Sequence, residues 1–129
     1  TQAAVPLMKD GGNILFTSSV YGLNLNGNPT LVLYSAGKAA VINFAQTMAE
    51  KLAPKIRCNV VAPGSTKTPA WNNADPAYVT DNLEMTLQKE WVLADEIADT
   101  FMFLIKTPHM NAQTIVVDGG WQKKIRPKH

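Results

Sequence analysis

The stretch Asn13-Ile14-Leu15-Phe16-Thr17-Ser18-Ser19 decides the fold, because an unbroken apolar run leads directly into two hydroxyl side chains. Consecutive apolar residues, rather than alternating apolar and polar ones, are typical of a strand that is covered on both faces of a parallel sheet. We therefore predict a strand over residues 13–18. Its carboxyl end places Ser18 and Ser19 where such sheets bind ligands.

Two further segments have the same character. Residues 57–62 and residues 113–118 are short and contain adjacent β-branched side chains. We predict a strand in each of them. The chain then leaves these strands at Pro63 and at Gly119, so three loops begin at the same edge of the sheet.

The segments between these strands have helical spacing. Apolar side chains recur at steps of three and four over residues 31–52 and again over residues 94–105, which predicts two amphipathic helices. We expect Thr30 to cap the first helix and Pro54 to end it.

The remaining helical signals are shorter. Aspartate followed by proline is a helix start, so a helix is expected from Asp75 to about residue 88. Residues 1–9 are interpreted as the end of another amphipathic helix.

The resulting order of strand, helix, strand, helix, strand is typical of a parallel α/β sheet. Right-handed crossovers alone would stack both long helices on one face, and the strand over residues 13–18 would keep an unpaired apolar edge. We therefore interpret the chain as part of a longer protein, or as a fragment that needs a complementary chain.

Composition excludes several classes of protein. The chain has 129 residues, 46% hydrophobic and 17% charged, which is typical of one globular domain. Four of its 12 Lys and Arg residues lie in a basic tail over residues 123–129, so we expect no nucleic-acid surface. One cysteine, Cys58, and two histidines predict neither disulfides nor a metal site. No apolar run is long enough for a membrane helix and no signal pattern is present, so we expect a cytoplasmic protein without membrane contact.

Tyr34 and Lys38 are four residues apart on the first long helix and therefore share a face. A lone pair with this spacing is weak evidence, because a solvated lysine beside a half-buried tyrosine gives the same pattern. The pair gains weight from Ser19, since a strand end and the following helix can converge above one edge of the sheet.

Five short motifs, taken together, resemble the short-chain dehydrogenase/reductase family. In the family's order they are ILFTSSVYG at residues 14–22, YSAGK at 34–38, NVVAPG at 59–64 with Thr68, DEIA at 95–98 and VDGG at 117–120. The resemblance implies that residues 1–129 are a partial domain, the carboxyl half of a Rossmann-like doubly wound parallel sheet. The Gly-rich pyrophosphate turn that begins such domains is absent from this sequence.

The resemblance also implies residue roles. Ser19, rather than Ser18, takes the place of the catalytic serine, Tyr34 that of the general acid/base, and Lys38 that of its helper. The contacts implied at the nicotinamide end of NAD or NADP are Tyr34, Lys38, Pro63, Gly64, Thr66 and Thr68. Residues 69–91 would form the variable substrate lid.

This chemistry is physically consistent with the residue types. Reducing a carbonyl by hydride transfer puts negative charge on its oxygen, which then needs a proton donor and a second hydrogen bond. A nearby ammonium such as that of Lys38 favours the phenolate form of a tyrosine and so eases proton exchange.

Some residues near the motifs allow two interpretations. Trp71, Tyr78 and Trp91 either line a substrate pocket or pack structurally, and Tyr21 either borders the site or packs its loop. We take Tyr21, Trp71 and Tyr78 as the candidate substrate contacts.

The leading hypothesis is an NAD(P)-dependent oxidoreductase that interconverts a small-molecule alcohol and a ketone or aldehyde. The alternative is a non-catalytic remnant or fragment that acts as a binding or assembly module. By resemblance, a homo-oligomer is expected, a dimer or tetramer that associates through the long helix and the last strand.

Overall fold

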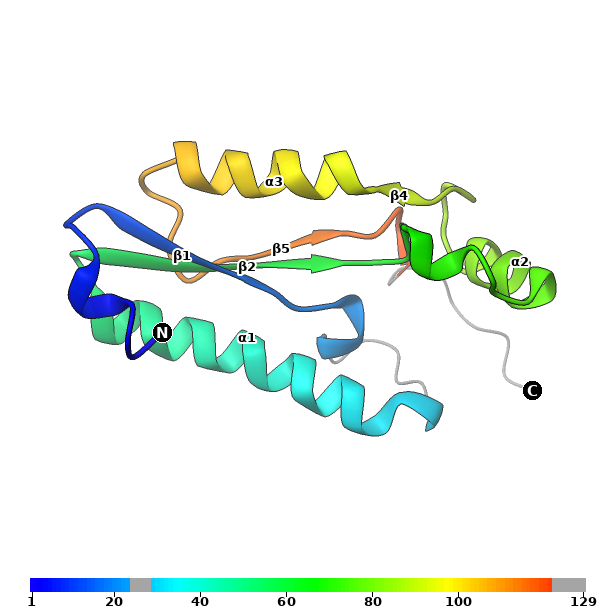
Figure 1. Ribbon diagram of the computed structural model, residues 1–129, viewed down its shortest axis with the longest axis horizontal. Helices are drawn as coiled ribbons and strands as arrows, with labels where there is room; N and C mark the ends of the chain where they lie inside the picture. Colours follow the sequence, from blue (N-terminus) through cyan, green and yellow to red (C-terminus); the bar gives the residue numbers. More distant parts are fainter. Residues whose placement is uncertain (24–28, 122–129) are drawn as a thin grey trace.

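The computed structural model describes residues 1–23 and 29–121. Its centre is a parallel sheet of three strands, β1 (Gly12–Thr17), β2 (Ile56–Pro63) and β5 (Thr114–Val117), in the order β1-β2-β5 (Figure 1). The predicted strands are confirmed, and each boundary lies within one residue of its expected position.

The central strand β2 is the core of the molecule. Its side chains from Cys58 to Ala62 are all fully buried, because strands flank β2 on both sides and helices cover it above and below. Asn59 is the polar member of this run. Its Nδ2 donates to the Met110 carbonyl at 2.8 Å and its Oδ1 accepts from Gln113 N at 3.0 Å, so burial leaves both ends of the amide partnered.

The two long helices lie on opposite faces of the sheet (Figure 1). Helix α1 (Val32–Leu52) packs on one face, where the Phe44 ring meets that of Phe16 edge-on at 5.7 Å between centroids. Helix α3 (Ala94–Lys106) covers the other face, where the Asn13 side chain donates to the Leu104 carbonyl at 3.1 Å.

The expectation that both helices share one face is therefore wrong, whereas a doubly wound sheet is found. The chain steps in the same direction from β1 to β2 and from β2 to β5, so helices on opposite faces require crossovers of opposite hand. The second connection is not a direct crossover. It first runs through residues 64–93 beyond the strand ends, and this excursion carries the chain to the other face.

Residues 64–93 form a separate small layer beyond the carboxyl ends of the strands (Figure 1). The short strands β3 (Thr66–Lys67) and β4 (Val92–Leu93) pair in parallel at its base. Between them, the 3-10 helix η4 (Pro69–Trp71) precedes α2 (Pro76–Glu84). Asp75 caps α2 as expected, because its Oδ1 accepts from Ala77 N at 2.8 Å.

Three local expectations differ from the structure. Helix α2 ends at Glu84 rather than near residue 88. The N-cap of α1 is Leu31, not Thr30, because the 3-10 helix η3 (Pro29–Leu31) leads into it. The first residues form turns and the 3-10 helix η1 (Val5–Leu7) rather than an α-helix.

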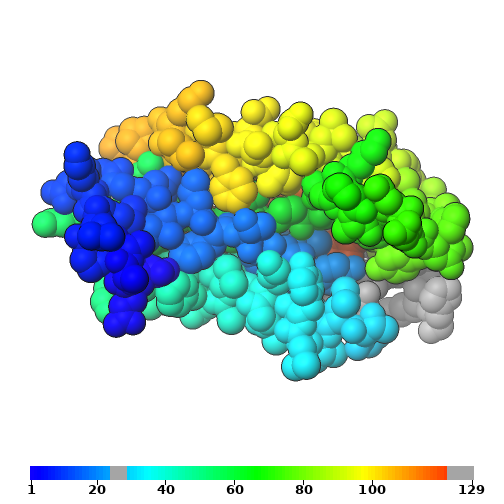
Figure 2. All heavy atoms as spheres, in the orientation of Figure 1, coloured from blue at the N-terminus to red at the C-terminus, as the bar shows by residue number. Residues whose placement is uncertain are grey.

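Strand β1 is an edge strand of the described residues, paired only with β2. Residues of this segment reach the surface between the two helical layers (Figure 2). The basic tail over residues 123–129 lies outside the described residues. Within residues 1–23 and 29–121, no helix has both the length and the apolar character that crossing a bilayer requires.

Candidate functional site

A cavity of about 350 Å³ opens where the chain leaves β1 and β2 and enters α1. The residues that line it come from five segments distant in sequence, which the parallel sheet brings to one edge. They are Ser19, Val20, Tyr21, Leu31, Tyr34, Gly64, Ser65, Thr66, Thr68, Trp71, Tyr78, Asn82 and Trp121.

Most of the residues singled out from the sequence lie around this cavity. Ser19 and Tyr34 line it together, as do the three candidate substrate contacts Tyr21, Trp71 and Tyr78 and the candidate cofactor contacts Gly64, Thr66 and Thr68. Lys38 and Pro63 do not line it. Lys38 lies one helical turn beyond Tyr34, and Pro63 is the last residue of β2.

The serine loop is built from local hydrogen bonds. Ser19 is extended, with φ −163° and ψ 158°, and its Oγ accepts from Tyr21 N at 3.2 Å. This bond caps the 3-10 helix η2 (Val20–Gly22), which turns the chain away from β1. Ser19 lines the cavity and is only 6% exposed, so the residue is largely shielded from open solvent.

The same loop is locked onto helix α1 at Lys38. The Ser18 hydroxyl donates to the Lys38 carbonyl at 2.7 Å, and Lys38 Nζ donates to the Thr17 carbonyl at 3.2 Å. Gly22 packs against the same point of the helix, since a Cβ there would lie 2.7 Å from the Lys38 carbonyl carbon. Ser18 and Gly22 thus fix the distance between the strand end that carries Ser19 and the helix that carries Tyr34.

Tyr34 and Lys38 share one face of α1. Lys38 Nζ lies 5.7 Å from the centroid of the Tyr34 ring, within the range of a cation–π contact. The ring of Tyr21 meets that of Tyr34 edge-on at 6.2 Å and that of Trp121 at 5.0 Å. Tyr34 lines the cavity and remains 46% exposed.

The exit of β2 is tightly packed. A Cβ at Gly64 would lie 2.8 Å from the Asp118 Cα, so only glycine allows the ends of β2 and β5 to approach this closely. Past this turn, Thr66 Oγ1 donates to the Gly64 carbonyl at 3.1 Å, and Ser65 Oγ donates to Asn82 Oδ1 at 3.0 Å. The first bond is local to the turn, and the second joins the exit of β2 to helix α2.

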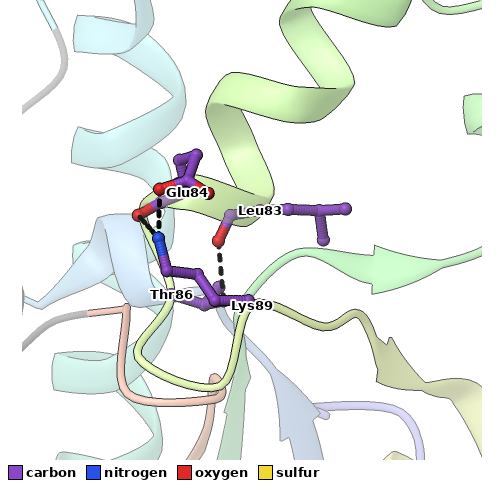
Figure 3. Close-up of polar contacts among 4 residues, drawn as sticks. All are labelled: Leu83, Glu84, Thr86 and Lys89. Atoms are coloured by element: carbon purple, nitrogen blue, oxygen red, sulfur yellow. Dashed lines mark hydrogen bonds and ion pairs between the residues drawn. The ribbon is translucent and has the colours of Figure 1, made fainter.

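The remaining wall of the cavity comes from residues 69–91, which we call the lid. After α2 the chain turns back, and Thr86 Oγ1 donates to the Leu83 carbonyl at 2.8 Å while Lys89 pairs with Glu84 (Figure 3). The amides of Leu87 and Gln88 then donate to the Gly119 carbonyl at 3.0 and 3.2 Å. The lid is therefore attached to the loop that follows β5.

Sequence reasoning missed several lining residues, including Leu31, Asn82 and Trp121. Trp121 had a usable signal, since it directly follows the Gly119-Gly120 exit of the third predicted strand. The sequence carries no comparable signal for Asn82, because an asparagine inside a short helix does not by itself indicate a binding site. Trp91 does not line the cavity and instead packs on Trp71.

A family model described as Enoyl-(Acyl carrier protein) reductase matches residues 1–122. The human 3-oxoacyl-[acyl-carrier-protein] reductase is 32% identical over 117 residues, 90% of this chain and 47% of that protein. The 7alpha-hydroxysteroid dehydrogenase of Bacteroides fragilis is 37% identical over 126 residues, 93% of this chain and 48% of that protein. The chain thus spans about half the length of the curated relatives it matches.

Solved structures show the same likeness. A small-chain dehydrogenase in complex with NADPH superposes with a TM-score of 0.84 at 28% identity, over 95% of this chain and 57% of that one. A short chain dehydrogenase from Burkholderia cenocepacia in complex with NADP gives 0.81 at 29% identity, over 93% of this chain and 49% of that one. Since the family match extends over nearly the whole chain and solved dehydrogenases share its fold, the chain belongs to the short-chain dehydrogenase/reductase family.

Proposed function

We propose that this chain supplies the catalytic half of an oxidoreductase that interconverts an alcohol and a ketone or aldehyde by hydride transfer with NAD or NADP. The observation that carries the proposal is one cavity bordered by both Ser19 and Tyr34, with Lys38 one helical turn away. The likeness to solved dehydrogenases in complex with NADPH and NADP supports the choice of cofactor.

The residues present fit the nicotinamide end of such a cofactor. A volume of about 350 Å³ is at the small end of ligand pockets, enough for a ring and its neighbouring groups but not for a whole dinucleotide with a substrate. Thr66 and Thr68 bring hydroxyls to this cavity, and Lys38 could donate to a ribose hydroxyl in place of the Thr17 carbonyl. When bound, the nicotinamide supplies the hydride.

The chain's own residues would hydrogen-bond the substrate's carbonyl oxygen and supply the proton that it takes up. In the reduction, the Tyr34 hydroxyl gives its proton to the carbonyl oxygen as negative charge develops there. The Ser19 hydroxyl donates a second hydrogen bond to the same oxygen, and a buried donor is effective because little water competes with it. Lys38 Nζ, 5.7 Å from the centroid of the Tyr34 ring, keeps a positive charge beside the ring whose hydroxyl gives up the proton.

The test combines binding and turnover. NADPH and NADH are titrated into the purified chain by nicotinamide fluorescence, and reduction of a ketone panel is followed by loss of nicotinamide absorbance. Tyr34→Phe should lower kcat by at least about 100-fold and change the cofactor Kd much less, because the ring stays and only the hydroxyl is lost. Turnover that persists in Tyr34→Phe would overturn the mechanism.

A matched pair of lysine variants tests the role of Lys38. Lys38→Met should weaken both kcat and cofactor binding, whereas Lys51→Met, in the last turn of the same helix, should alter neither. Micromolar binding of NADPH or NADH by the folded chain would argue against the alternative of a non-catalytic binding or assembly module.

The chain is also expected to form a homo-oligomer. Helix α1 exposes apolar side chains in its first turn and its middle, with Val32 63%, Leu33 88% and Phe44 46% exposed. Apolar side chains left in solvent along one helix favour association with another protein surface. Sedimentation velocity on the chain and on Leu33→Glu tests this, since the variant should be smaller if α1 mediates association.

A further inference from the structure

The lid carries an aromatic stack that the proposed chemistry does not use. The ring of Trp71, in η4, lies nearly parallel to that of Tyr78, in α2, with 20° between the planes and 5.9 Å between the centroids. On the Trp71 ring a second contact comes from Trp91, at 4.6 Å and 56°. Three parts of the lid are thus joined by their rings.

The members of this stack differ in their access to the cavity. Trp71 and Tyr78 line it, whereas Trp91 does not. Trp91 therefore acts as a support that fixes the orientation of the Trp71 ring. The part of the Trp71 ring that lines the cavity is therefore already ordered, so a ligand that binds there avoids the loss of conformational entropy that a mobile side chain would incur.

A second aromatic group borders the same cavity. Tyr34, Tyr21 and Trp121 form a chain of edge-to-face contacts, and all three line the cavity. Five of the lining residues are therefore aromatic. The other described lining residues carry hydroxyl, amide or aliphatic side chains or none, and no ionised group is among them.

Flat aromatic walls favour flat or ring-shaped ligands. A ring ligand keeps offset-stacked contact with an aromatic face over its whole area, whereas a flexible chain must first be ordered to do so. The substrate would share the cavity of about 350 Å³ with the nicotinamide end of the cofactor, so the part of the substrate that lies inside it must be compact. An uncharged lining favours an uncharged ligand, since a buried ion needs a partner.

We infer that the substrate is an uncharged ketone or alcohol built on one or two fused rings, with Trp71 as the stacking residue that determines this specificity. The inference rests on the proposed function, because the carbonyl of this molecule is the group that Ser19 and Tyr34 would act on. Its ring system lies against Trp71 at the lid side of the cavity.

The test compares two ketones that have the same number of carbon atoms, 1-tetralone with fused rings and 2-decanone with an open chain. The chain should reduce 1-tetralone with the higher kcat/KM. Trp71→Leu keeps an apolar side chain but removes the aromatic face, and it should lower kcat/KM for 1-tetralone about five- to tenfold while changing that for 2-decanone less than about twofold. Trp71→Phe should keep most of the preference. Phe103→Leu also replaces an aromatic side chain by leucine, but at a half-exposed position of α3 that does not line the cavity. It is the control for the loss of an aromatic ring as such.

Binding is measured separately, so that failure of the inference and failure of the proposed function can be told apart. Calorimetric titration of 1-tetralone into the chain should show binding that Trp71→Leu weakens and Phe103→Leu does not. Equal loss for both ketones in Trp71→Leu, or no loss for either, would overturn the stacking inference even if turnover is normal. Binding of 1-tetralone that depends on Trp71, without any turnover, would retain the stacking inference and overturn the proposed function.

Discussion

The hydroxyl of Ser18 donates a 2.7 Å hydrogen bond to the main-chain carbonyl of Lys38, and the Lys38 ammonium donates back to the Thr17 carbonyl at 3.2 Å. This reciprocal pair joins the end of β1 to the middle of α1. Ser18 therefore acts as a positioning residue, whereas its neighbour Ser19 faces the cavity.

Replacing the two adjacent serines by alanine should have different effects, one mainly on stability and the other mainly on kcat. Ser18→Ala removes a buried hydrogen bond and should lower the free energy of unfolding by about 1 kcal/mol, with a modest fall in kcat. Ser19→Ala should lower kcat about 100-fold, as loss of an oxyanion donor does, for a similar or smaller cost in stability. Urea unfolding and steady-state kinetics measure the two effects, and an equal fall in kcat for both variants would argue against this division of roles.

Gly22 should not tolerate a side chain. A Cβ there would lie 2.7 and 2.8 Å from the carbonyl carbon and oxygen of Lys38, and main-chain atoms of a helix cannot move aside cheaply. Gly22→Ala should lower the free energy of unfolding by about 1–3 kcal/mol. Gly37→Ala is the matched control, because a Cβ at Gly37 meets nothing within 4 Å. There alanine should stabilise α1 by about 0.5–1 kcal/mol, and a loss in both variants would contradict the argument.

Arg57 should contribute more to the free energy of unfolding than Lys106, the exposed cation at the end of α3. Arg57 Nη1 shares its two hydrogens among the carbonyls of Leu104, Thr107 and Met110 at 3.0, 3.1 and 2.8 Å, and these contacts join β2 to the end of α3 and to the turn after it. Arg57→Leu should lower the free energy of unfolding by about 2–3 kcal/mol. Lys106→Leu, which removes an exposed cation from the same helix end, should cost less than about 1 kcal/mol.

Cys58 should be unreactive in the folded chain. Its side chain is fully buried in β2, and burial raises the pKa of the thiol, so little thiolate is available to react. A thiol reagent should label it only as fast as the chain unfolds. Because the unfolded chain releases this proton at lower pH than the folded chain, the thiol's contribution to stability is lost as the pH rises past about 8.5. Cys58→Ala should remove that part of the pH dependence in urea unfolding, and rapid labelling of the folded chain would contradict the burial argument.

Much of this fold could be predicted because its signals are local. The strand cores, the two long helices and the Asp75 cap follow from apolar spacing and capping residues within a few positions. The cluster of Ser19 and Tyr34 was also predictable, since parallel strands bring their carboxyl ends to one edge.

The remainder depends on contacts that sequence spacing does not encode. The face on which α3 packs is set by the route of residues 64–93, and apolar periodicity is the same on either face. The early end of α2 at Glu84 depends on its turn back toward Gly119, a distant partner. Likewise, nothing in the spacing of Trp71, Tyr78 and Trp91 shows that two of them line the cavity and the third supports them.

Replacing Ala112 by glycine should stabilise the folded chain. Its φ is +57°, in the left-handed region where a Cβ is strained, and its amide donates to the Cys58 carbonyl at 2.9 Å, so the conformation is held by the sheet. Ala112→Gly should therefore raise the free energy of unfolding by about 1 kcal/mol, the strain released less the extra entropy of the unfolded glycine. Ala40→Gly, the same substitution at an exposed position inside α1, should lower it by about the same amount, because there alanine is the favoured residue. Opposite signs in urea unfolding would identify the backbone angle at Ala112 as the cause, whereas a loss of stability in both variants would show that the strain at Ala112 is relieved elsewhere.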